Sequence, residues 1–200
     1  MLTIGLTGGI ATGKSAVAVF LEERPQIAVL DADRVAREVV EPGSEALRQI
    51  QAAFGPRYIR PDGHLDREGL GKRVVTDSEA RSRLEAITHP QIRSRILTAL
   101  IDLADEGFQV AVVEAALLVE TGSHRSYDQL WVVTCEADIQ LQRLVSRQGC
   151  SEEEAEAWIA AQLPLEEKVA LAQVVIENNG SLEELSALVD VAVQGLDLSG

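Results

Sequence analysis

The chain has 200 residues, of which 46% are hydrophobic and 25% are charged. This length fits one compact domain, with or without insertions, and the composition is typical of a globular protein and not of a disordered one. The formal net charge of -14 repels polyanions, so we expect no general binding to nucleic acid or to anionic membranes. A local basic pocket for a small phosphorylated ligand is still compatible with this charge.

The cysteines and the apolar segments indicate the cellular compartment in which we expect the protein. Cys135 and Cys150 provide neither a disulfide framework nor the spacing of zinc ligands. The N-terminal residues lack the basic region and long apolar segment of a signal peptide. No apolar stretch approaches the roughly 20 residues that cross a bilayer, because Glu114 interrupts the longest one, at 110–119. We therefore expect a soluble, cytoplasmic protein without a membrane partner.

Short apolar runs alternate with helix-compatible stretches along the chain. The runs that predict buried strands are 2–6, 27–30, 110–113, 130–134 and 174–176. Helices are predicted at 14–22, 33–40, 92–104, 137–146, 151–162 and 182–193, and several of them open with Ser, Asp or other acidic residues. The alternation predicts an α/β fold with a parallel five-stranded sheet flanked by helices.

Two regions depart from this alternation. The stretch from 41 to about 106 contains several Pro and Gly turn signals with helical patterning between them and no strong strand, which indicates a helical insertion. The stretch 137–168 is polar and rich in Glu, Gln and Arg. A mobile cover over a site is one interpretation of it.

The strongest motif is the loop from Gly8 to Ser15, which fits the pattern G-x-x-x-x-G-K-[ST] between a predicted strand and a predicted helix. Glycines allow successive N–H groups to face inward, so that they and the helix N-terminus surround phosphate oxygens. Lys14 then reaches the β- and γ-phosphates, and the Ser15 hydroxyl can ligate Mg²⁺. The alternative, a glycine-rich turn with a solvated lysine, is disfavoured by this context. The motif does not separate a kinase from a GTPase or a mechanical ATPase.

Two carboxylates follow the second predicted strand, where ligands of open α/β sheets bind. If the chain stays extended, Asp31 and Asp33 both face the site. One carboxylate can then accept a proton from an acceptor hydroxyl, while the other helps to position a metal or Arg37. The alternative is that Asp33 only caps the following helix.

Taken together, these residues resemble the dephospho-coenzyme A kinase family. The resemblance covers nearly the whole chain in order and spacing, and its combination of motifs is more specific than the P-loop alone. The motifs that carry it are Gly5-Leu6-Thr7-Gly8-Gly9-Ile10 with the P-loop, Asp31-Ala32-Asp33, Ala36-Arg37, Val40-Glu41-Pro42-Gly43, His89-Pro90 with Ile92, Leu117-Leu118 with Glu120, Gln140 with Arg143 and Arg147, Gln162, Lys168 and Val175-Ile176-Glu177-Asn178-Asn179-Gly180.

The resemblance implies a kinase-type P-loop fold and a reaction. Residues 1–200 would form one domain, with a nucleotide-binding core of about 1–34, 108–136 and 169–197. A helical region of about 35–107 would bind the acceptor, and a lid of about 137–168 would close over ATP. The implied reaction is transfer of the γ-phosphate of ATP, with Mg²⁺, to the ribose 3'-hydroxyl of dephospho-CoA, the last step of coenzyme A biosynthesis.

The resemblance also implies roles for individual residues. Asp33 would be the catalytic base, with Lys14 and Arg143 supplying charge. ATP would be bound by Gly8, Gly9, Ile10, Ala11, Thr12, Gly13, Lys14, Ser15, Ala16, Arg143, Arg147 and Asn179. The acceptor would contact Thr7, Asp33, Arg37, His89, Leu117 and Leu118. Ser15, and in one interpretation Asp31, would ligate Mg²⁺.

Several of these residues have plainer interpretations. Arg143 and Arg147 are four residues apart, as on a solvated helical face with Glu partners. His89-Pro90 also suits a turn before the helix predicted from residue 92. Leu117 and Leu118 fit a core or a pocket wall, Glu120 fits a solvated carboxylate, and the loop of Asn178, Asn179 and Gly180 fits a strand-to-helix turn.

Three positions depart from the family pattern. Ala11 replaces a P-loop Gly, Ala116 replaces a Pro, and Gln173 replaces an Asp. We expect activity to survive at Ala11, on the condition that its φ is negative. Gln173 puts one hydrogen-bonding role in doubt.

Two competing functions follow from the same loop. One is another small-molecule kinase, for a nucleoside monophosphate or a sugar acid, and the other is a nucleotide-dependent switch that binds a partner protein. The chain has no Asn-Lys-x-Asp motif for guanine, and the acidic strand end at Asp31 and Asp33 fits an acceptor alcohol better. We expect a monomer or a weak homo-oligomer.

Overall fold

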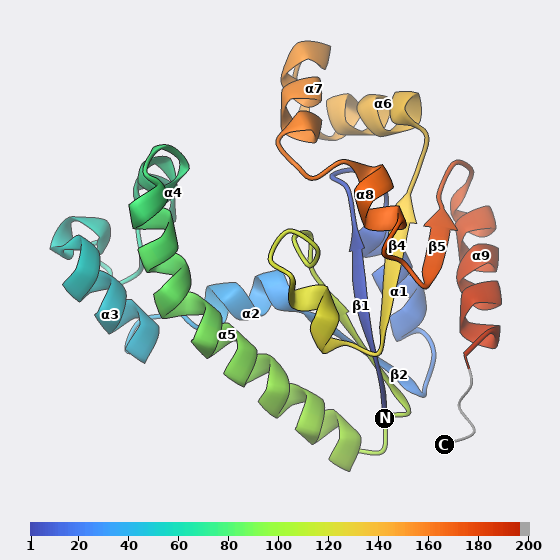
Figure 1. The fold of residues 1–200 in the computed structure, drawn as a ribbon, viewed down its shortest axis with the longest axis horizontal. Helices are drawn as coiled ribbons and strands as arrows, with labels where there is room; N and C mark the ends of the chain where they lie inside the picture. The colour runs from blue at the N-terminus through green and yellow to red at the C-terminus, as the bar shows by residue number, and fades with distance from the viewer. Residues whose placement is uncertain (197–200) are drawn as a thin grey trace. The chain divides into compact units, whose positions relative to one another are not determined.

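The computed structural model describes residues 1–196 of the chain (Figure 1). The core range expected from the sequence ends at 197, which lies outside the described residues. Two compact units are present. One consists of Met1–Asp31 and the chain from Leu103 onward, and the other is Ala32–Asp102. Each unit has its own cluster of buried apolar side chains.

The first unit is built on a parallel sheet of five strands in the order β2-β3-β1-β4-β5. The strands are β1 (Leu2–Gly8), β2 (Ile27–Asp31), β3 (Val110–Glu114), β4 (Gln129–Thr134) and β5 (Val174–Glu177). All five predicted strands are confirmed, each with one or two further residues. The predicted α/β class is confirmed with them.

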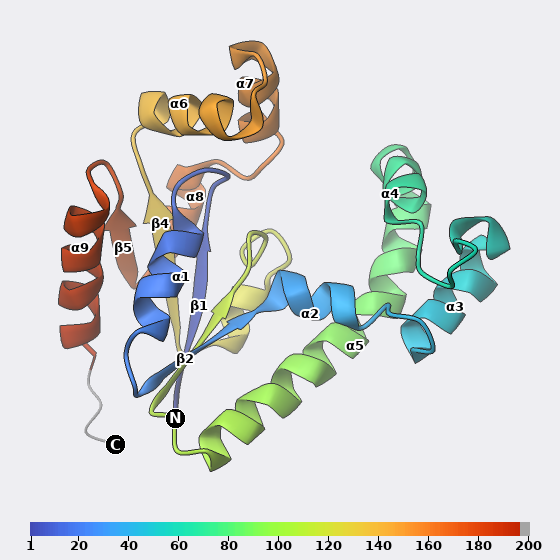
Figure 2. The same cartoon turned by 180° about the vertical axis from the view of Figure 1, so that it is seen from behind.

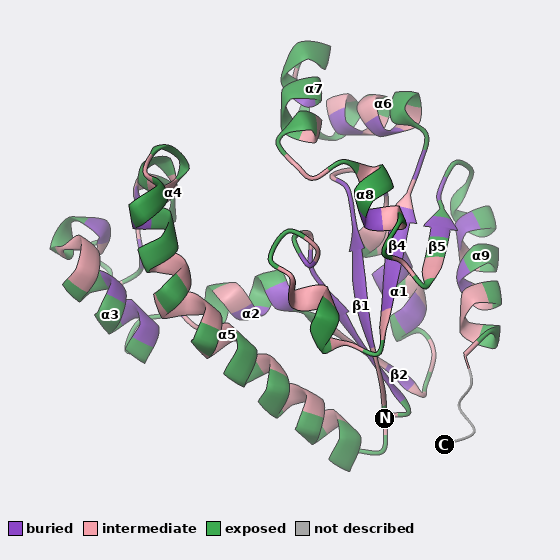
Figure 3. Ribbon diagram, viewed as in Figure 1, coloured by how far each residue is buried: buried purple, intermediate pink, exposed green. Residues whose placement is uncertain are grey.

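Alternate side chains of the strands face the two sides of the sheet. On one side Ile4 and Leu6 of β1 pack with apolar residues of α1 (Lys14–Glu22) and α9 (Leu182–Gln194), and this cluster is the core of the unit. Figures 1 and 2 show α1 and α9 on this face and α8 (Leu165–Val169) against β4 on the other. The central strands β3, β1 and β4 are mostly buried in Figure 3, as expected for a parallel sheet covered on both faces.

The helices of the first unit largely follow the sequence pattern. α1 has the predicted bounds, and α6 (Ala137–Gln148), α7 (Glu152–Ala160) and α9 lie within two residues of theirs. Ser151 and Ser181 each form a capping box at the start of α7 and α9, which fixes where these helices begin. The five-residue helix α8 was not predicted, because one turn leaves no periodic pattern.

The second unit is helical, as predicted for this region. Its elements are α2 (Ala32–Glu38), α3 (Glu45–Phe54), the 3-10 helix η1 (Pro56–Tyr58), α4 (Arg67–Thr76) and most of α5 (Ser78–Asp105). Its core gathers apolar side chains of α3, η1 and α4, together with Leu84 and Ile87 of α5. Ser44 and Asp66 cap α3 and α4 with side-chain oxygens, which marks their first residues.

The interpretation of His89-Pro90 as a turn is wrong. α5 runs through both residues, and Pro90 lies inside the helix. Proline removes one helical hydrogen bond there, but Leu84 and Ile87 pack into the core of the second unit just before it. The helix therefore begins at Ser78 and not near residue 92, because tertiary packing outweighs the local signal.

The first unit also contains the 3-10 helix η2 (Ser123–Ser126). None of the helices within residues 1–196 combines the length and the apolarity that a membrane span requires.

Candidate nucleotide-binding site

The loop between β1 and α1 has the geometry of a phosphate cradle. Gly13 stands at the N-cap of α1 with a φ of 97°, and no side chain caps the helix there. The N-terminus of α1 thus keeps its partial positive charge for a bound anion. The glycines are required by space as well, because a Cβ at Gly8 would lie 2.5 Å from the carbonyl oxygen of Val133. Thr12 is fully buried and donates from Oγ1 to the carbonyl oxygen of Gly9 at 2.9 Å.

Lys14 and Ser15 share one carboxylate partner, Glu114 at the end of β3. Lys14 Nζ lies 2.5 Å from Glu114 Oε1, and Ser15 donates from Oγ to the same oxygen at 3.2 Å. The side chains of Lys14 and Glu114 are 14% and 11% exposed, so this contact is largely shielded from water. The two residues predicted to hold the phosphates and the metal therefore meet at one carboxylate.

Asp31 and Glu114 end neighbouring parallel strands in register with each other. Side chains in register on parallel strands point to the same face. The carboxyl edge of the sheet thus carries the carboxylates of Asp31 and Glu114 on one face, and Ser15 of the P-loop contacts Glu114. Oxygen ligands of this kind are those that Mg²⁺ prefers, usually one or two from the protein with the rest from phosphates and water.

The premise that residues 31–33 stay extended is wrong. β2 ends at Asp31 and α2 begins at Ala32, so Asp33 lies in the first helical turn of the second unit. Arg37 lies in the last turn of the same helix, and its carbonyl oxygen accepts a hydrogen bond from Arg67 Nη2 at 2.8 Å. His89 is half-buried in α5. The predicted roles of these three residues in acceptor binding stay predictions.

Asn178 connects the P-loop to helix α6. Its Nδ2 donates to the carbonyl oxygen of Thr12 at 2.8 Å, and a Cβ at Gly13 would lie only 2.0 Å from that nitrogen. Arg143 of α6 donates from Nη1 to the carbonyl oxygen of Asn178 at 2.8 Å and from Nη2 to that of Gly180 at 3.4 Å. Arg143 therefore braces the loop after β5.

The other residues predicted near ATP lie around this brace. Asn179 accepts a hydrogen bond from the backbone N–H of Glu136 at 2.8 Å and so fixes the start of α6. Ala16 lies in the first turn of α1, and Arg147 is exposed in the last turn of α6. Cys135, beside them, is buried, and burial raises the pKa of its thiol although Arg143 opposes this shift.

The condition attached to Ala11 is not met. Its φ is +62°, in the left-handed region that favours glycine. Survival of activity with alanine at position 11 therefore stays a prediction. The backbone strain at Ala11 is a feature of this chain.

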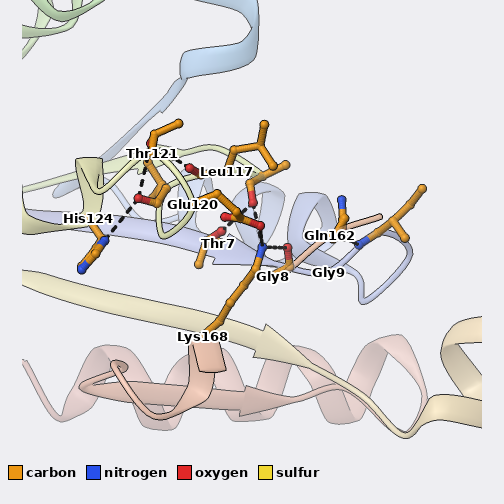
Figure 4. Close-up of polar contacts among 12 residues, drawn as sticks. Thr7, Gly8, Gly9, Leu117, Glu120, Thr121, His124, Gln162 and Lys168 are labelled. Atoms are coloured by element: carbon orange, nitrogen blue, oxygen red, sulfur yellow. Dashed lines mark hydrogen bonds and ion pairs between the residues drawn. The ribbon is translucent and has the colours of Figure 1, made fainter. Parts of the chain in front are cut away.

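A buried lysine lies beside the first glycine of the loop (Figure 4). Lys168 of α8 is fully buried, and its Nζ lies 2.7 Å from Glu120 Oε1, 3.0 Å from the carbonyl oxygen of Ala116 and 3.5 Å from that of Gly8. Glu120 is thus ion-paired, and its interpretation as a solvated carboxylate is wrong. Thr7 donates from Oγ1 to the same Ala116 oxygen at 3.1 Å.

The loop after β3 holds the remaining predicted acceptor contacts. Leu118 is buried and close to Gly5, where a Cβ would lie 3.0 Å from it and 2.8 Å from the ring of Tyr127. Leu117 is 46% exposed and is available to a ligand. Burial raises the pKa of Tyr127 to about 12, so its hydroxyl stays protonated at neutral pH.

Two departures from the family pattern are accommodated by the structure. Ala116 forms its hydrogen bonds through the backbone carbonyl oxygen, which accepts from Thr7 and Lys168. Gln173 accepts a hydrogen bond from the N–H of Leu130 through Oε1 at 2.7 Å. Gln173 thus forms a hydrogen bond to the backbone of β4.

Sequence reasoning gave no role to Glu114, Asn178 or Lys168. Glu114 was noted only because it interrupts an apolar run, although a carboxylate at the end of a buried strand is the same signal that drew attention to Asp31. Asn178 and Lys168 belong to motifs of the resemblance, but Asn178 contacts Thr12 across 166 residues and Lys168 contacts the carbonyl oxygen of Ala116 across 52. A local pattern does not identify such partners.

Comparison with known proteins connects this site to a family. A sequence model of the dephospho-CoA kinase family matches residues 2–184. The chain belongs to the dephospho-CoA kinase family. The dephospho-CoA kinase of Geobacter sulfurreducens is 50% identical over 190 residues, which are 95% of this chain and 96% of that protein. The resemblance seen in the motifs is thereby confirmed.

Solved structures agree with this membership in the dephospho-CoA kinase family. TT1252 from Thermus thermophilus matches with a TM-score of 0.84 at 34% identity, over 98% of both chains. The dephospho-CoA kinase from Campylobacter jejuni matches with a TM-score of 0.72 at 27% identity, over 96% of this chain and 95% of that one. The likeness extends over nearly the full length of each chain, so it includes both compact units.

Proposed function

We propose that the protein transfers the γ-phosphate of ATP to the ribose 3'-hydroxyl of dephospho-CoA, giving coenzyme A and ADP. The observation that carries this proposal is the convergence of Lys14 and Ser15, the last two residues of the P-loop, on Glu114 in a chain of the dephospho-CoA kinase family. A site of this kind binds a nucleoside triphosphate with a divalent cation. Membership in the dephospho-CoA kinase family supports dephospho-CoA as the phosphate acceptor.

Phosphoryl transfer passes through a loose transition state, so alignment and charge stabilisation provide most of the catalysis. Asp33 accepts the proton of the 3'-hydroxyl, and the hydroxyl oxygen forms a bond to the γ-phosphorus. The bond from that phosphorus to the bridging oxygen breaks, and ADP leaves. Lys14 offsets the negative charge on the β- and γ-phosphates. In this proposal Arg143 and Arg147 supply further positive charge from α6.

Magnesium fits the oxygen donors at the carboxyl edge of the sheet. Ser15 and Glu114 would hold the cation, with Asp31 as a further ligand from the neighbouring strand. When bound, it would offset the negative charge of the β- and γ-phosphates. Lys14, which lies 2.5 Å from Glu114 here, then contacts the phosphates.

The remaining assignments divide between donor and acceptor. Residues 8–16 with Asn179 would bind ATP, and Thr7, Arg37, His89, Leu117 and Leu118 would line the acceptor site. Residues 35–107 would receive the acceptor, and residues 137–168 would cover ATP as a lid. We further propose that the enzyme works in the cytoplasm as a monomer or weak homo-oligomer. Its cysteines, Cys135 and Cys150, are both free thiols, which suits a reducing compartment.

The deciding experiment is an acceptor assay. The purified protein is incubated with ATP, Mg²⁺ and dephospho-CoA, and coenzyme A and ADP are quantified by mass spectrometry, with ³¹P NMR to locate the new phosphate on the 3'-oxygen. Parallel reactions contain a nucleoside monophosphate, a sugar acid or no acceptor. We expect dephospho-CoA to give the highest kcat/KM. A folded protein that forms no coenzyme A, or that prefers another acceptor, would contradict the proposal.

A further inference from the structure

The P-loop contains a strained residue. Among residues 1–196, Ala11 is the one non-glycine residue with a positive φ, 62°. In an L-residue this angle brings Cβ close to the following carbonyl oxygen. Without contacts that hold it, the residue would return to a negative φ. Unlike Asn or Asp, alanine has no polar side chain that compensates by a local hydrogen bond. Contacts from outside the residue must therefore hold it.

On the N-terminal side, two glutamines hold both backbone groups of Ile10. Gln162 accepts from the Ile10 N–H through Oε1 at 2.8 Å, and Gln140 donates from Nε2 to the Ile10 carbonyl oxygen at 2.8 Å. Gln140 is 4% exposed, so water competes little for its bond. A Cβ at Gly9 would lie 2.7 Å from the Gln140 nitrogen, which shows how closely the side chain approaches the loop.

Both glutamines belong to the segment proposed as the lid. Gln140 lies in α6, and Gln162 follows α7 shortly before α8 begins. Figure 4 shows the Gln162 side chain directed at the loop beside Gly9. The two residues approach Ile10 from separate parts of the chain: Gln162 accepts from its N–H, and Gln140 donates to its carbonyl oxygen. We call Gln140 and Gln162 the glutamine clamp.

On the C-terminal side of Ala11, Thr12 is fixed as well. Its carbonyl oxygen accepts from Asn178 at 2.8 Å, and its hydroxyl donates to the carbonyl oxygen of Gly9 at 2.9 Å. The peptide group after Ala11 is held as well, because the Thr12 N–H donates to the carbonyl oxygen of Gly9 at 3.4 Å. With its neighbours fixed, Ala11 has little freedom to return to a negative φ.

We propose that Gln140 and Gln162 are positioning residues for ATP, which keep the P-loop in its phosphate-binding shape by holding Ala11 in the left-handed conformation. This inference rests on the proposed use of the loop for ATP. The N–H groups of a P-loop bind phosphate only while they point inward together. Release of the Ile10 peptide lets Ala11 relax and turns these groups away from one another. In this chain the lid segment thus sets the affinity of the loop for phosphate.

The proposal makes a specific demand on residue 11. Glycine occupies the left-handed region without penalty, so the clamp should matter less when Ala11 is replaced by Gly. If the two glutamines only fastened the lid to the core, their removal would have the same effect whichever residue stood at position 11. A double-mutant cycle between the clamp and position 11 separates these two roles.

The test uses the full-length protein in four forms: wild type, Gln162→Ala, Ala11→Gly and the double variant. ATP binding is measured by calorimetry without acceptor, and KM for ATP and for dephospho-CoA is measured by steady-state kinetics. We expect Gln162→Ala to weaken ATP binding about tenfold, as for loss of about one hydrogen bond. We expect Ala11→Gly to change it less than about threefold, and Gln162→Ala to cost less than about threefold in the Gly background. The KM for dephospho-CoA should stay near wild type.

A second double-mutant cycle combines Gln140→Ala with Ala11→Gly. The matched control is Gln142→Ala, at an exposed position of α6. Gln142→Ala should leave ATP affinity unchanged. Equal losses in the Ala and Gly backgrounds would overturn the proposal, and so would clamp variants that fail to fold in both backgrounds. A failure of the proposed function can be told apart from a failure of this proposal. In that case the wild type would form no coenzyme A, but the ATP affinities of the four forms could still be measured and compared.

Discussion

Asn178 donates a hydrogen bond from Nδ2 to the carbonyl oxygen of Thr12 at 2.8 Å, across 166 residues of sequence. The donor is 6% exposed and the acceptor residue is fully buried. The loop after β5 and the P-loop are thereby fixed to each other, and Arg143 adds its bond to the Asn178 carbonyl oxygen. One amide side chain connects the phosphate end of the site to α6.

This relationship predicts a large effect of a small change at residue 178. Asn178→Asp replaces the donor by a carboxylate that faces the Thr12 carbonyl oxygen, so attraction becomes repulsion. We expect kcat/KM for ATP to fall by about 10²-fold or more, and Asn178→Ala to cost about tenfold. Steady-state kinetics at varied ATP measure both. The exposed α9 variant Glu183→Ala serves as the control. An Asp variant as active as the Ala variant would argue against the bond.

The shared contact of Lys14 and Ser15 with Glu114 predicts a role in the use of magnesium. Glu114→Gln keeps the size of the side chain but removes the negative charge that a cation prefers. We expect a higher Mg²⁺ concentration for half-maximal activity and a loss in kcat of at least about tenfold. The measurement is a Mg²⁺ titration of turnover at fixed ATP. Glu106→Gln, exposed just after α5, is the control, and an unchanged Mg²⁺ dependence would contradict the assignment.

Asp33 is the proposed base and lies in the first turn of α2. Asp33→Asn keeps the volume of the side chain and removes its ability to accept the proton. We expect kcat to fall by about 10²- to 10⁴-fold, while ATP affinity measured without acceptor stays near wild type. Glu38→Gln, in the last turn of the same helix, should keep its activity. A kcat within about threefold of wild type would remove Asp33 from the role of base.

The ion pair of the fully buried Lys168 with Glu120, whose side chain is 21% exposed, predicts non-additive stabilities. Glu120→Ala leaves the buried ammonium without its charged partner, and we expect a loss of about 3 kcal/mol in the free energy of unfolding. The double variant Glu120→Ala with Lys168→Met removes both charges and should lose less than the sum of the single variants. Urea unfolding gives these values.

A matched control is available in the exposed pair of Lys72 and Glu68, whose atoms are 2.6 Å apart but whose side chains are 76% and 74% exposed. Lys72→Met should change the free energy of unfolding by less than about 1 kcal/mol, since water screens this pair. Additive losses at Lys168 and Glu120 would show that the two charges are not coupled.

Asp128 predicts a pH dependence of stability. Its carboxylate accepts from Oγ1 of Thr3 at 2.7 Å and from the Thr3 N–H at 2.8 Å, and these hydrogen bonds lower the pKa of Asp128 below its usual value of 3.8. A carboxyl group with a lowered folded-state pKa stabilises the fold above its unfolded-state pKa, and this contribution is lost as the pH falls through the folded-state pKa.

We therefore expect Asp128→Asn to destabilise the protein at pH 7, by less than about 1 kcal/mol because the site is exposed. The difference from wild type should shrink as the pH is lowered below about 4. Urea unfolding at pH 7 and at acidic pH measures it, with the exposed Asp105→Asn as reference. A difference that stays constant over this range would contradict the prediction.

The sequence alone determined the sheet, the P-loop and the family. Five apolar runs, the spacing of Gly8, Gly13, Lys14 and Ser15, and helix starts such as Ser151 and Ser181 are local signals, each contained within a few residues. Periodicity and capping arise from the backbone of neighbouring residues, so they can be read without knowledge of the fold. The ends of the β1 and β2 segments also predict where a ligand would bind.

Only the tertiary structure decided which residues meet and what the backbone must tolerate. Glu114 reaches Lys14, Asn178 reaches Thr12, and the left-handed angle at Ala11 is set by the closure of the loop and by the glutamine clamp. α5 continues through Pro90 because its apolar side chains pack into the second unit. Contacts between distant residues leave no periodic mark on the chain, because their energies depend on the packed fold and not on local sequence.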